Sequence, residues 1–368
     1  MVEVLVSGYY GFKNAGDEAI LGGIIRSVRE LDPQAHFTVL SGNTVATAHL
    51  HGVEAVGRTD LRAIWRALGR ADLLLTGGGS LLQDVTSWRT VPYYLAICAL
   101  ALLHRRPVMW YAQGIGPVQR PFSRWLVRWI GNRVAAITLR DVESAGTLAE
   151  IGVRRPPLTV TADAAFALAP GDSERGMALL RAAGVPDGMP LVGVSLRPWP
   201  HAPNFERVLA GALDRLAAEL GGAVVFLPMQ LPQDERMAQA VRQQMQAPNW
   251  SLGGDLNYRQ ALDVISSLDL LVGLRYHALV FAAMSGVPVV GLSYDPKNDS
   301  FLAQLGLSAA GSPSDLDREV LLTAARRALT DREAMRQSLL ARAAELAQRS
   351  QENARQALTL AGRERERV

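Results

Sequence analysis

Three basic residues stand inside the otherwise apolar stretch LDLLVGLRYHALVFAAMSGVPVVGLSYDPK, residues 268–297, where they could bind an anion. The run LDLLVGL is typical of a buried strand, and the residues from Arg275 to Gly286 have the pattern of a helix. Arg275 and His277 therefore stand at the expected start of a helix, and Lys297 follows the next apolar run. The positive end of the helix dipole repels cations at a helix N-terminus, and a bound anion would offset this repulsion. The pattern predicts an anion site, and the alternative is an ordinary buried histidine.

Lysine is scarce in this chain, and this makes the two lysines informative. Of 38 basic residues only Lys13 and Lys297 are lysine, and the rest are arginine. A chain that uses arginine for its surface cations retains lysine where a compact ammonium group is needed. Lys297 therefore joins the candidate anion site as a possible proton donor.

Glycine-rich segments follow other expected strands, and their polar residues are candidates for contact with a ligand. GYYGFKNAGDEAIL, residues 8–21, contains neither G-x-G-x-x-G nor a Walker A motif, so it is not a nucleotide-binding fingerprint. We expect Asn14 and Asp17 to face a ligand; the alternative is a glycine turn followed by the acidic first turn of a helix.

The segment TGGGSLLQD, residues 76–84, places three glycines after a strand, which favours close approach of backbone to a ligand at Gly78 and Gly79. Asp84 is expected near the start of the next helix, either as a helix cap or as a general base for a hydroxyl group. In AQGIGP, residues 112–117, Gln113 could donate hydrogen bonds to a sugar.

Two further arginines also end expected strands. Arg140 ends TLRD and Arg197 lies in SLRPW, so both can present a cation at a sheet edge. Structural pairing of Arg140 with Asp141 is the alternative for the first of them. His201 follows on a loop, either at the surface or facing a substrate.

The elements that must position these residues alternate between strands and amphipathic helices in two series, which predicts parallel sheets covered on both faces. We expect an N-terminal Rossmann-like domain over residues 1–170, a second over 171–330, and a helical tail over 331–368 that packs across the junction. The expected strands are residues 2–8, 36–41, 72–79, 107–114, 134–141, 191–199, 223–229, 268–274 and 287–294. Ligands of such sheets bind at the carboxyl ends of the strands, which predicts a site in a cleft between the two domains.

Composition narrows the class of protein. The net charge of +3 gives no field for nucleic acid, and the one cysteine, Cys98, excludes an internal disulfide and a cysteine metal site. The start MVEVLVSG has the pattern of a strand rather than of a signal peptide, and the longest apolar run, residues 93–103, is too short to span a bilayer. We expect a cytoplasmic protein. The Trp- and Arg-containing segment 120–133 is either a peripheral membrane contact or an ordinary amphipathic helix.

Together, the segments GYYGFKNAGDEAIL, LLLTGGGSLLQD, AQGIGP, LRD, TADAAFAL and RYHALVFAAMSGVPVVGLSYDPK resemble the polysaccharide pyruvyl transferase family, particularly its CsaB-like bacterial members. The resemblance implies a GT-B-like fold and transfer of a pyruvyl group from phosphoenolpyruvate to a sugar, with a 4,6-ketal and phosphate as products. It implies an N-acetylmannosamine acceptor in a lipid-linked cell-wall precursor, whose ketal later anchors S-layer homology domains. Neither cofactor nor metal is implied.

Carried over by motif, the resemblance implies that phosphoenolpyruvate is bound by Arg140, Arg275, Tyr276 through its backbone, His277 and Lys297, with Asp84 as the base. The general acid that protonates C3 would be His277 or Lys297. Two alternatives from other classes are a GT-B glycosyltransferase that uses a nucleotide sugar and a non-catalytic protein that binds a glycan or an anion.

Overall fold

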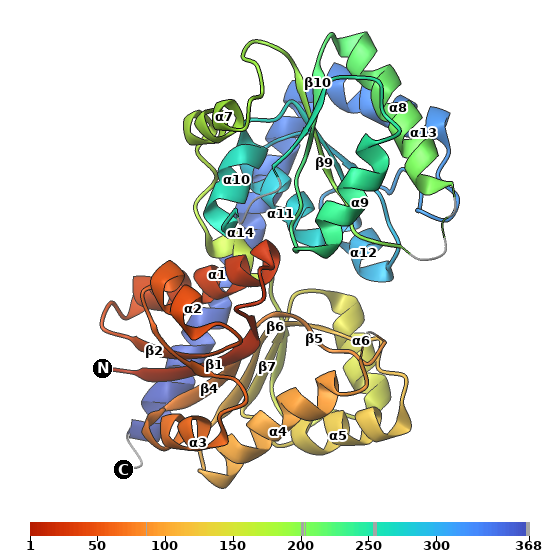
Figure 1. Ribbon diagram of the computed structural model, residues 1–368. Coiled ribbons are helices and arrows are strands. Elements are labelled where there is room, and N and C mark those ends of the chain that lie inside the picture. Colours follow the sequence, from red (N-terminus) through yellow and green to blue (C-terminus); the bar gives the residue numbers. More distant parts are fainter. Residues whose placement is uncertain (86, 200–201, 203, 253–255, 366–368) are drawn as a thin grey trace. The chain divides into compact units, whose positions relative to one another are not determined.

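The structure is a computed structural model that describes residues 1–85, 87–199, 202, 204–252 and 256–365. It divides into two compact units (Figure 1). Unit 1 comprises Met1–Phe12, Asp17–Leu168 and Leu346–Val368, and unit 2 comprises Lys13–Gly16 and Ala169–Glu345. The short segment Lys13–Gly16 therefore belongs to unit 2, although the chain on either side of it belongs to unit 1.

Unit 1 is built on a parallel sheet of order β3-β2-β1-β4-β6-β7-β8, with β5 paired to β6. The central strands are buried on both faces, as expected when helices cover a parallel sheet. The order reverses between β1 and β4, which places the switch point of this sheet after these two strands. The strands are β1 (Glu3–Tyr10), β2 (His36–Ser41), β3 (Glu54–Gly57), β4 (Leu73–Thr76), β5 (Gly79–Leu82), β6 (Val108–Ile115), β7 (Ala136–Leu139) and β8 (Leu158–Val160).

Two helical layers cover the unit 1 sheet, as the ribbon in Figure 1 shows. One layer packs the helices α3 (Leu61–Arg70), α4 (Thr90–Leu103), α5 (Pro121–Gly131) and α6 (Val142–Ile151) into one apolar core. The other layer packs α1 (Ala15–Leu31) together with the C-terminal part of α14 (Arg332–Arg365). Helix α2 (Thr44–His51) lies beside β2 and β3.

Unit 2 is built on a parallel sheet of order β11-β10-β9-β12-β13, whose switch point lies between β9 and β12. Its strands are β9 (Leu191–Ser195), β10 (Ala223–Phe226), β11 (Asn249–Ser251), β12 (Leu270–Gly273) and β13 (Val289–Gly291). One face packs against α8 (Phe205–Leu220), α9 (Gln233–Arg242) and α13 (Arg318–Thr330). The helices α7 (Ser173–Ala182), α10 (Tyr258–Ser266) and α11 (Tyr276–Ser285) pack together, and α11 lies against β12 and β13. Helix α12 (Pro296–Gln304) follows β13.

The predicted fold class, α/β with two Rossmann-like units, is confirmed by the two parallel sheets and their covering helices. Two local predictions were wrong. The stretch before residue 169, where no strand was expected after residue 141, forms β8 and the 3-10 helix Ala164–Ala167, because its LTVT run pairs with β7. Residues 79–82 form the strand β5 instead of a loop, so Asp84 is not at a helix start, and α4 begins only at Thr90.

Candidate functional site

In unit 2, four of the predicted residues stand in the segments that directly follow neighbouring strands. Arg197 follows β9, Arg275 and His277 follow β12, and Lys297 follows β13. These strands are adjacent in the order β9-β12-β13 and parallel, so their carboxyl ends meet at one edge of the sheet. We call this edge, with these four residues, the cationic edge.

Arg275 is fixed by two partners, one on α9 and one in the connection between β10 and α9. Its guanidinium donates two hydrogen bonds to the Asp234 carboxylate, one of them from Nε over 2.8 Å, and a third to Oε1 of Gln230 over 3.2 Å. The Asp234 side chain is 1% exposed and the Arg275 side chain 16% exposed. The buried Asp234 carboxylate thus holds the guanidinium group of Arg275 in place at the sheet edge.

The same carboxylate organises the backbone beside Arg275. Asp234 accepts hydrogen bonds from the N–H groups of Met229 and Gln230, at 3.1 and 2.9 Å. This backbone in turn binds the segment Lys13–Gly16, because Ala15 N–H donates to the carbonyl of Met229 and Asn14 forms an antiparallel bridge with Gln230. Unit 2 therefore carries a piece of the glycine-rich loop at its cationic edge.

Gly16 lies directly against His277. A Cβ atom added to Gly16 would stand 2.3 Å from Nδ1 and 3.0 Å from Cβ of His277. Since the imidazole and its own Cβ are both in the way, only glycine fits without moving the ring. This glycine of the segment 8–21 therefore brings its backbone against a candidate catalytic side chain.

A Gly16→Ala substitution is therefore expected to displace the His277 ring and to lower turnover about tenfold or more, since small misplacements of a reacting group have large kinetic costs. The melting temperature should fall by only a few degrees. Steady-state kinetics and a thermal scan check this, with Gly146→Ala as the matched control, because a Cβ on Gly146 meets nothing within 4 Å. Equal activity of the Gly16 and Gly146 variants would contradict the placement of His277.

Helix α11 supplies the N-terminus that the sequence predicted. Its N-cap residue is Arg275 in extended conformation, and no side chain caps the helix. The helix is apolar and almost entirely buried beyond its first turn, whereas Arg275, Tyr276 and His277 are half-buried at the edge. An uncapped N-terminus flanked by arginine and histidine favours an anion electrostatically.

Lys297 stands in the first turn of α12, and Asp295 is the N-cap of that helix. The Asp295 carboxylate accepts from the backbone N–H of Lys297 over 2.9 Å. Behind them, buried Asn298 donates to the carbonyl of Leu274, which ties α12 to the end of β12. Lys297 is thereby held at the edge that carries Arg275.

Arg197 is held by an aromatic ring from the neighbouring loop. Its guanidinium donates to the Tyr294 hydroxyl over 2.7 Å and lies 4.5 Å from the centre of the same ring. It is half-buried. His201, which follows in the sequence, lies outside the described residues.

In unit 1, Gln113 is completely buried. Its Nε2 donates to the carbonyls of Thr76 and Gly77, over 2.9 and 2.5 Å. It therefore holds the backbone at the end of β4 in place. This geometry assigns the side chain a supporting role, in contrast to the direct sugar contact expected from its position.

The glycines that Gln113 supports lie close to α1. Gly79 has φ +84°, and a Cβ there would come within 3.3 Å of the Asp17 carboxylate. A Cβ on Gly78 would lie 3.1 Å from the carbonyl oxygen of Ala112. Asp17 is half-buried in the first turn of α1, so a carboxylate stands at the switch point between β1 and β4.

Arg140 is buried at the end of β7, with its side chain 5% exposed. It donates to Asp163 over 2.9 Å and to the Ser80 hydroxyl over 3.1 Å, and Asp141 lies 3.6 Å away. Two carboxylates thus already balance its charge. The network connects β7, β5 and the 3-10 helix behind the glycine segment.

Asp84 binds the connection between β6 and α5. Its two carboxylate oxygens accept from the N–H groups of Gln119 and Arg120, each over 2.9 Å. Burial acts to raise the pKa of Asp84, but these hydrogen bonds outweigh it and hold the pKa below its ordinary value. A carboxylate with both oxygens engaged and a lowered pKa is a weak base.

An Asp84→Asn substitution is expected to lower the free energy of unfolding by about 1–3 kcal/mol at neutral pH, since Asn cannot accept from both N–H groups. Because the folded-state pKa is lowered, the stabilisation is present above the unfolded pKa of about 4 and is lost as pH falls through the folded pKa. The difference in unfolding free energy between wild type and variant should therefore be constant from pH 5 to 7 and shrink below about pH 4. Urea titrations across this range check it, and a gap that is constant down to pH 2 would contradict it.

Several residues that organise these edges were missed in the sequence. Asp234, Asp163 and Tyr294 each hold a predicted arginine, and Asp163 lies in the TADAAFAL segment that carried part of the family resemblance. The buried pair of Glu18 and His51, 2.8 Å apart, also escaped notice, although Glu18 accepts from Gly11 N–H and so anchors the glycine-rich loop. Their partners are distant in the chain, so no spacing pattern marks them.

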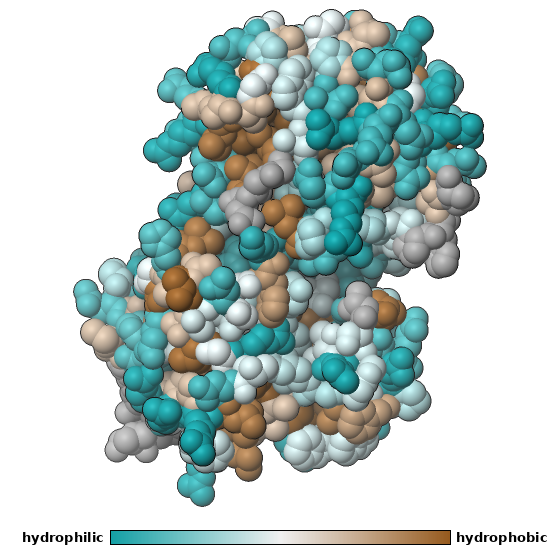
Figure 2. Space-filling model, viewed as in Figure 1, coloured by the Kyte–Doolittle hydropathy of each residue, from teal (hydrophilic) through white to brown (hydrophobic). Residues whose placement is uncertain are grey.

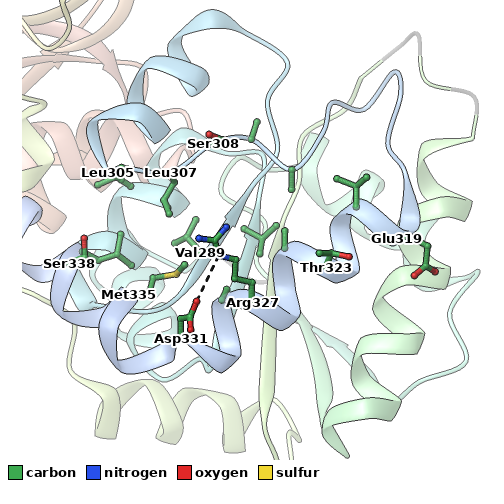
Figure 3. Close-up of a pocket in the computed structure, with 18 residues that line it drawn as sticks. Val289, Leu305, Leu307, Ser308, Glu319, Thr323, Arg327, Asp331, Met335 and Ser338 are labelled. Atoms are coloured by element: carbon green, nitrogen blue, oxygen red, sulfur yellow. Dashed lines mark ion pairs between the residues drawn. The ribbon is translucent and has the colours of Figure 1, made fainter.

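A cavity of about 740 Å³ lies elsewhere in unit 2, between β13, residues 305–310, α13 and the start of α14 (Figure 3). Figure 3 shows apolar and small side chains around it, and the ion pair between Arg327 and Asp331, 3.8 Å apart. None of the predicted residues that the structure describes lines this cavity. The arginine that lines it, Arg327, is paired with Asp331, so the cavity offers little positive charge to an anionic substrate.

Over the described part of the chain, no cluster of three or more His, Cys, Asp or Glu side chains is arranged to hold a metal ion. Over the same residues, no helix has the length and apolar character needed to cross a bilayer.

Comparison with known proteins decides the family. The family model described as polysaccharide pyruvyl transferase matches residues 14–296, which include Arg197, Arg275 and His277 of the cationic edge. The chain belongs to the polysaccharide pyruvyl transferase family. This confirms the resemblance found in the sequence. The chain is similar, at 23% identity over 275 residues, to the amylovoran biosynthesis protein AmsJ of Erwinia amylovora. The match covers 67% of this chain and 62% of the length of AmsJ.

Solved structures of low sequence identity share the fold of this pyruvyl transferase family member. Anabaena HepE in complex with UDP-glucose superposes with a TM-score of 0.61 at 14% identity, over 100% of this chain and 99% of that one. Staphylococcus aureus MnaA with UDP superposes with a TM-score of 0.65 at 14% identity, over 95% of this chain and 94% of that one. A Rickettsia africae glycosyltransferase superposes with a TM-score of 0.64 at 11% identity, over 100% of both chains. The GT-B-like fold expected from the resemblance is confirmed.

Proposed function

We propose that this protein transfers the pyruvyl group of phosphoenolpyruvate to a sugar of a polysaccharide precursor, with a 4,6-ketal and phosphate as products. The observation that carries the proposal is the cationic edge of unit 2, where Arg197, Arg275, His277 and Lys297 follow the carboxyl ends of the adjacent strands β9, β12 and β13, with Arg275 at the N-terminus of α11. Phosphoenolpyruvate carries a carboxylate and a phosphate, and binding both requires several cations. Membership of the family supplies the reaction class.

Within this proposal, Arg275 is the principal phosphate ligand. Its guanidinium is already oriented by buried Asp234, so little side-chain entropy is lost when the donor binds. The N-terminus of α11, including the backbone of Tyr276, adds the positive end of a helix dipole. Arg197 and Lys297 balance the remaining negative charge.

The chemistry requires one acid and one base. A general acid, His277 or Lys297, protonates C3 of the enol while a sugar hydroxyl attacks C2 and gives its proton to the base. The resulting phosphorylated tetrahedral carbon loses phosphate by cleavage of its C2–O bond when the second hydroxyl attacks. The proton of this hydroxyl passes to the departing phosphate, and the ketal closes. Arg275 stabilises the departing phosphate throughout. The contact of Gly16 with His277 favours the histidine, because it fixes the position of that ring.

For the base, the structure favours Asp17 over the predicted Asp84. Both oxygens of Asp84 accept backbone N–H groups and its pKa is lowered, whereas Asp17 is half-buried at the switch point of the unit 1 sheet, beside Gly79. Arg140 was expected to bind the donor; with Asp163 and Asp141 beside it, its proposed role is to position the glycine segment.

The acceptor in this proposal is an N-acetylmannosamine unit of a lipid-linked cell-wall precursor, as the family resemblance implies. Relation to a protein named for amylovoran biosynthesis supports a polysaccharide acceptor in general terms. No cofactor takes part in the proposed steps, since phosphoenolpyruvate is itself the donor substrate.

A nucleotide-sugar transferase is the second candidate, favoured by the fold similarity to proteins solved with UDP or UDP-glucose. Calorimetric titration separates the two. The proposal predicts that phosphoenolpyruvate binds wild-type protein and that Arg275→Gln weakens this binding at least about tenfold, as expected for loss of a charged hydrogen-bonding partner. UDP binding in the absence of any phosphoenolpyruvate binding would favour the second candidate.

A further inference from the structure

Unit 1 exposes tryptophan to an unusual degree. Of the seven tryptophans in the chain, four are between 44% and 56% exposed, namely Trp65, Trp88, Trp125 and Trp129. All four belong to the layer of α3, α4 and α5 or to the segment that leads into α4. Tryptophan is usually largely buried, and exposed clusters of it mark contact surfaces, above all at the membrane–water interface.

Helix α5 has an aromatic outer face where a covering helix would ordinarily be polar. Ser123, Val127 and Ile130 are buried against the sheet. On the exposed side, Phe122, Trp125 and Trp129 follow one another at helical spacing. Their rings stack in sequence, with centroids 6.1 and 6.2 Å apart. Phe122 is 60% exposed, so this stripe has no covering element in the described chain.

The stretch of chain that carries this stripe is basic. Residues 85–140 contain eight arginines and neither an aspartate nor a glutamate. Arg124 and Arg128 flank the aromatic stripe on α5, and Arg133 lies 4.5 Å from the centre of the Trp129 ring. The net charge of the whole chain is only +3, so the basic excess is concentrated here.

A shallow groove of about 410 Å³ adjoins the stripe and has the same chemistry. Trp125 and Trp129 line it together with Arg128, Arg133, Arg154 and Arg155. Indole rings beside guanidinium groups suit a phosphate headgroup, which accepts hydrogen bonds from arginine while the rings lie at the level of the acyl boundary.

Exposed leucines extend the apolar surface over the same layer of helices. Helices α3, α4 and α5 pack side by side, and Leu61 and Leu103 on two of them are 67% and 71% exposed. In Figure 2, the surface at the foot of the view, over α4 and α5, carries brown and tan apolar residues among teal ones. Exposed leucines gain nothing from a nucleic-acid phosphodiester but do gain from insertion into acyl chains.

We propose that the aromatic–arginine face, formed by Phe122, Trp125, Trp129, Arg124, Arg128 and Arg133, docks on the surface of an anionic phospholipid bilayer. The helix α5 lies in the plane of the interface, with its aromatic stripe in the acyl boundary and its arginines at the headgroups. The inference does not depend on the identity of the donor substrate, since none of these residues belongs to the cationic edge.

Flotation of the full chain with phosphatidylglycerol–phosphatidylcholine vesicles tests the proposal, with tryptophan fluorescence as a second readout. We expect binding to these vesicles at physiological salt, a blue shift of the emission, and weak binding to pure phosphatidylcholine. The double variant Trp125→Ser/Trp129→Ser should bind at least about tenfold more weakly. Arg124→Gln/Arg128→Gln should lose a similar factor and most of the salt dependence.

Val320→Ser is the matched control, since Val320 is a 52% exposed apolar residue on α13 in unit 2. It should bind vesicles like wild type, and all variants should keep the wild-type melting temperature. Equal binding of wild type and the double tryptophan variant would overturn the proposal. A second outcome would also overturn it: the protein does not bind vesicles, but it associates with itself or with single-stranded RNA, and both double variants abolish that association. The face would then serve that partner.

Discussion

Replacing His277 with glutamine is expected to reduce kcat by at least about 10²–10³-fold and to leave the fold intact, since loss of a general acid typically costs this much. His277 is half-buried in the first turn of α11, with the backbone of Gly16 against its ring. Glutamine keeps the volume and a hydrogen-bonding group but cannot transfer a proton. Single-turnover kinetics with phosphoenolpyruvate and acceptor measure the loss.

His49→Gln serves as the control, because His49 is exposed on α2, at the surface of unit 1. It should retain wild-type kcat. A parallel Lys297→Gln variant separates the two candidate acids: if lysine is the acid, its variant loses kcat to the larger extent and the His277 variant mainly raises KM. A His277 variant with wild-type kcat and KM would remove histidine from the mechanism.

Replacing Asp234 with alanine is expected to have the largest effect on stability. Its carboxylate is buried, accepts from the Arg275 guanidinium and caps the N–H groups of Met229 and Gln230. Removing one partner of a buried ion pair leaves an uncompensated charge and costs about 3–5 kcal/mol of unfolding free energy. KM for phosphoenolpyruvate should rise as well, because Arg275 loses the group that orients it.

Chemical denaturation and kinetics of the same variant measure both effects. Glu219→Gln is a suitable comparison, since Glu219 also binds two arginines, Arg215 and Arg326, but on the exposed surface of unit 2. Exposed pairs contribute little, so this variant should unfold at nearly the wild-type denaturant concentration. An Asp234 variant as stable as the Glu219 variant would mean that Arg275 is held by other contacts.

The fold could be predicted because its signal is local. Buried parallel strands read as short apolar runs, and amphipathic helices alternate with them, so the two sheets follow from periodicity alone. The exceptions are short edge elements such as β3, β8 and β11, whose three or four residues carry too little pattern. Strand β5 is a similar case, since its glycine start resembles a loop.

The cationic edge could be predicted because parallel strands place their following residues at one edge. Arg275, His277 and Lys297 were recognised by being charged in an apolar context, which is also a local signal. The partners of these residues were not recognised. Asp234 lies 41 positions from Arg275, and no spacing rule selects it among the 35 acidic residues.

For Asp84, the catalytic role stays a prediction, and its hydrogen bonds show why the sequence alone could not decide it. Its position after a strand suggested a catalytic carboxylate, but its oxygens accept the N–H groups of Gln119 and Arg120, 35 and 36 positions away. Gln113 is a similar case, with its amide bound to the backbone of β4. A polar residue at a strand end is equally suited to a ligand and to a neighbouring backbone, and only the tertiary packing distinguishes the two.

The most direct test of the central claim is to incubate the purified chain with phosphoenolpyruvate and an N-acetylmannosamine-containing glycan, and to measure phosphate and glycan mass together. The account predicts release of phosphate only when the glycan is present, in equal amount to a pyruvyl ketal on the glycan, and loss of both products with His277→Gln. Consumption of a nucleotide sugar with no consumption of phosphoenolpyruvate would contradict it.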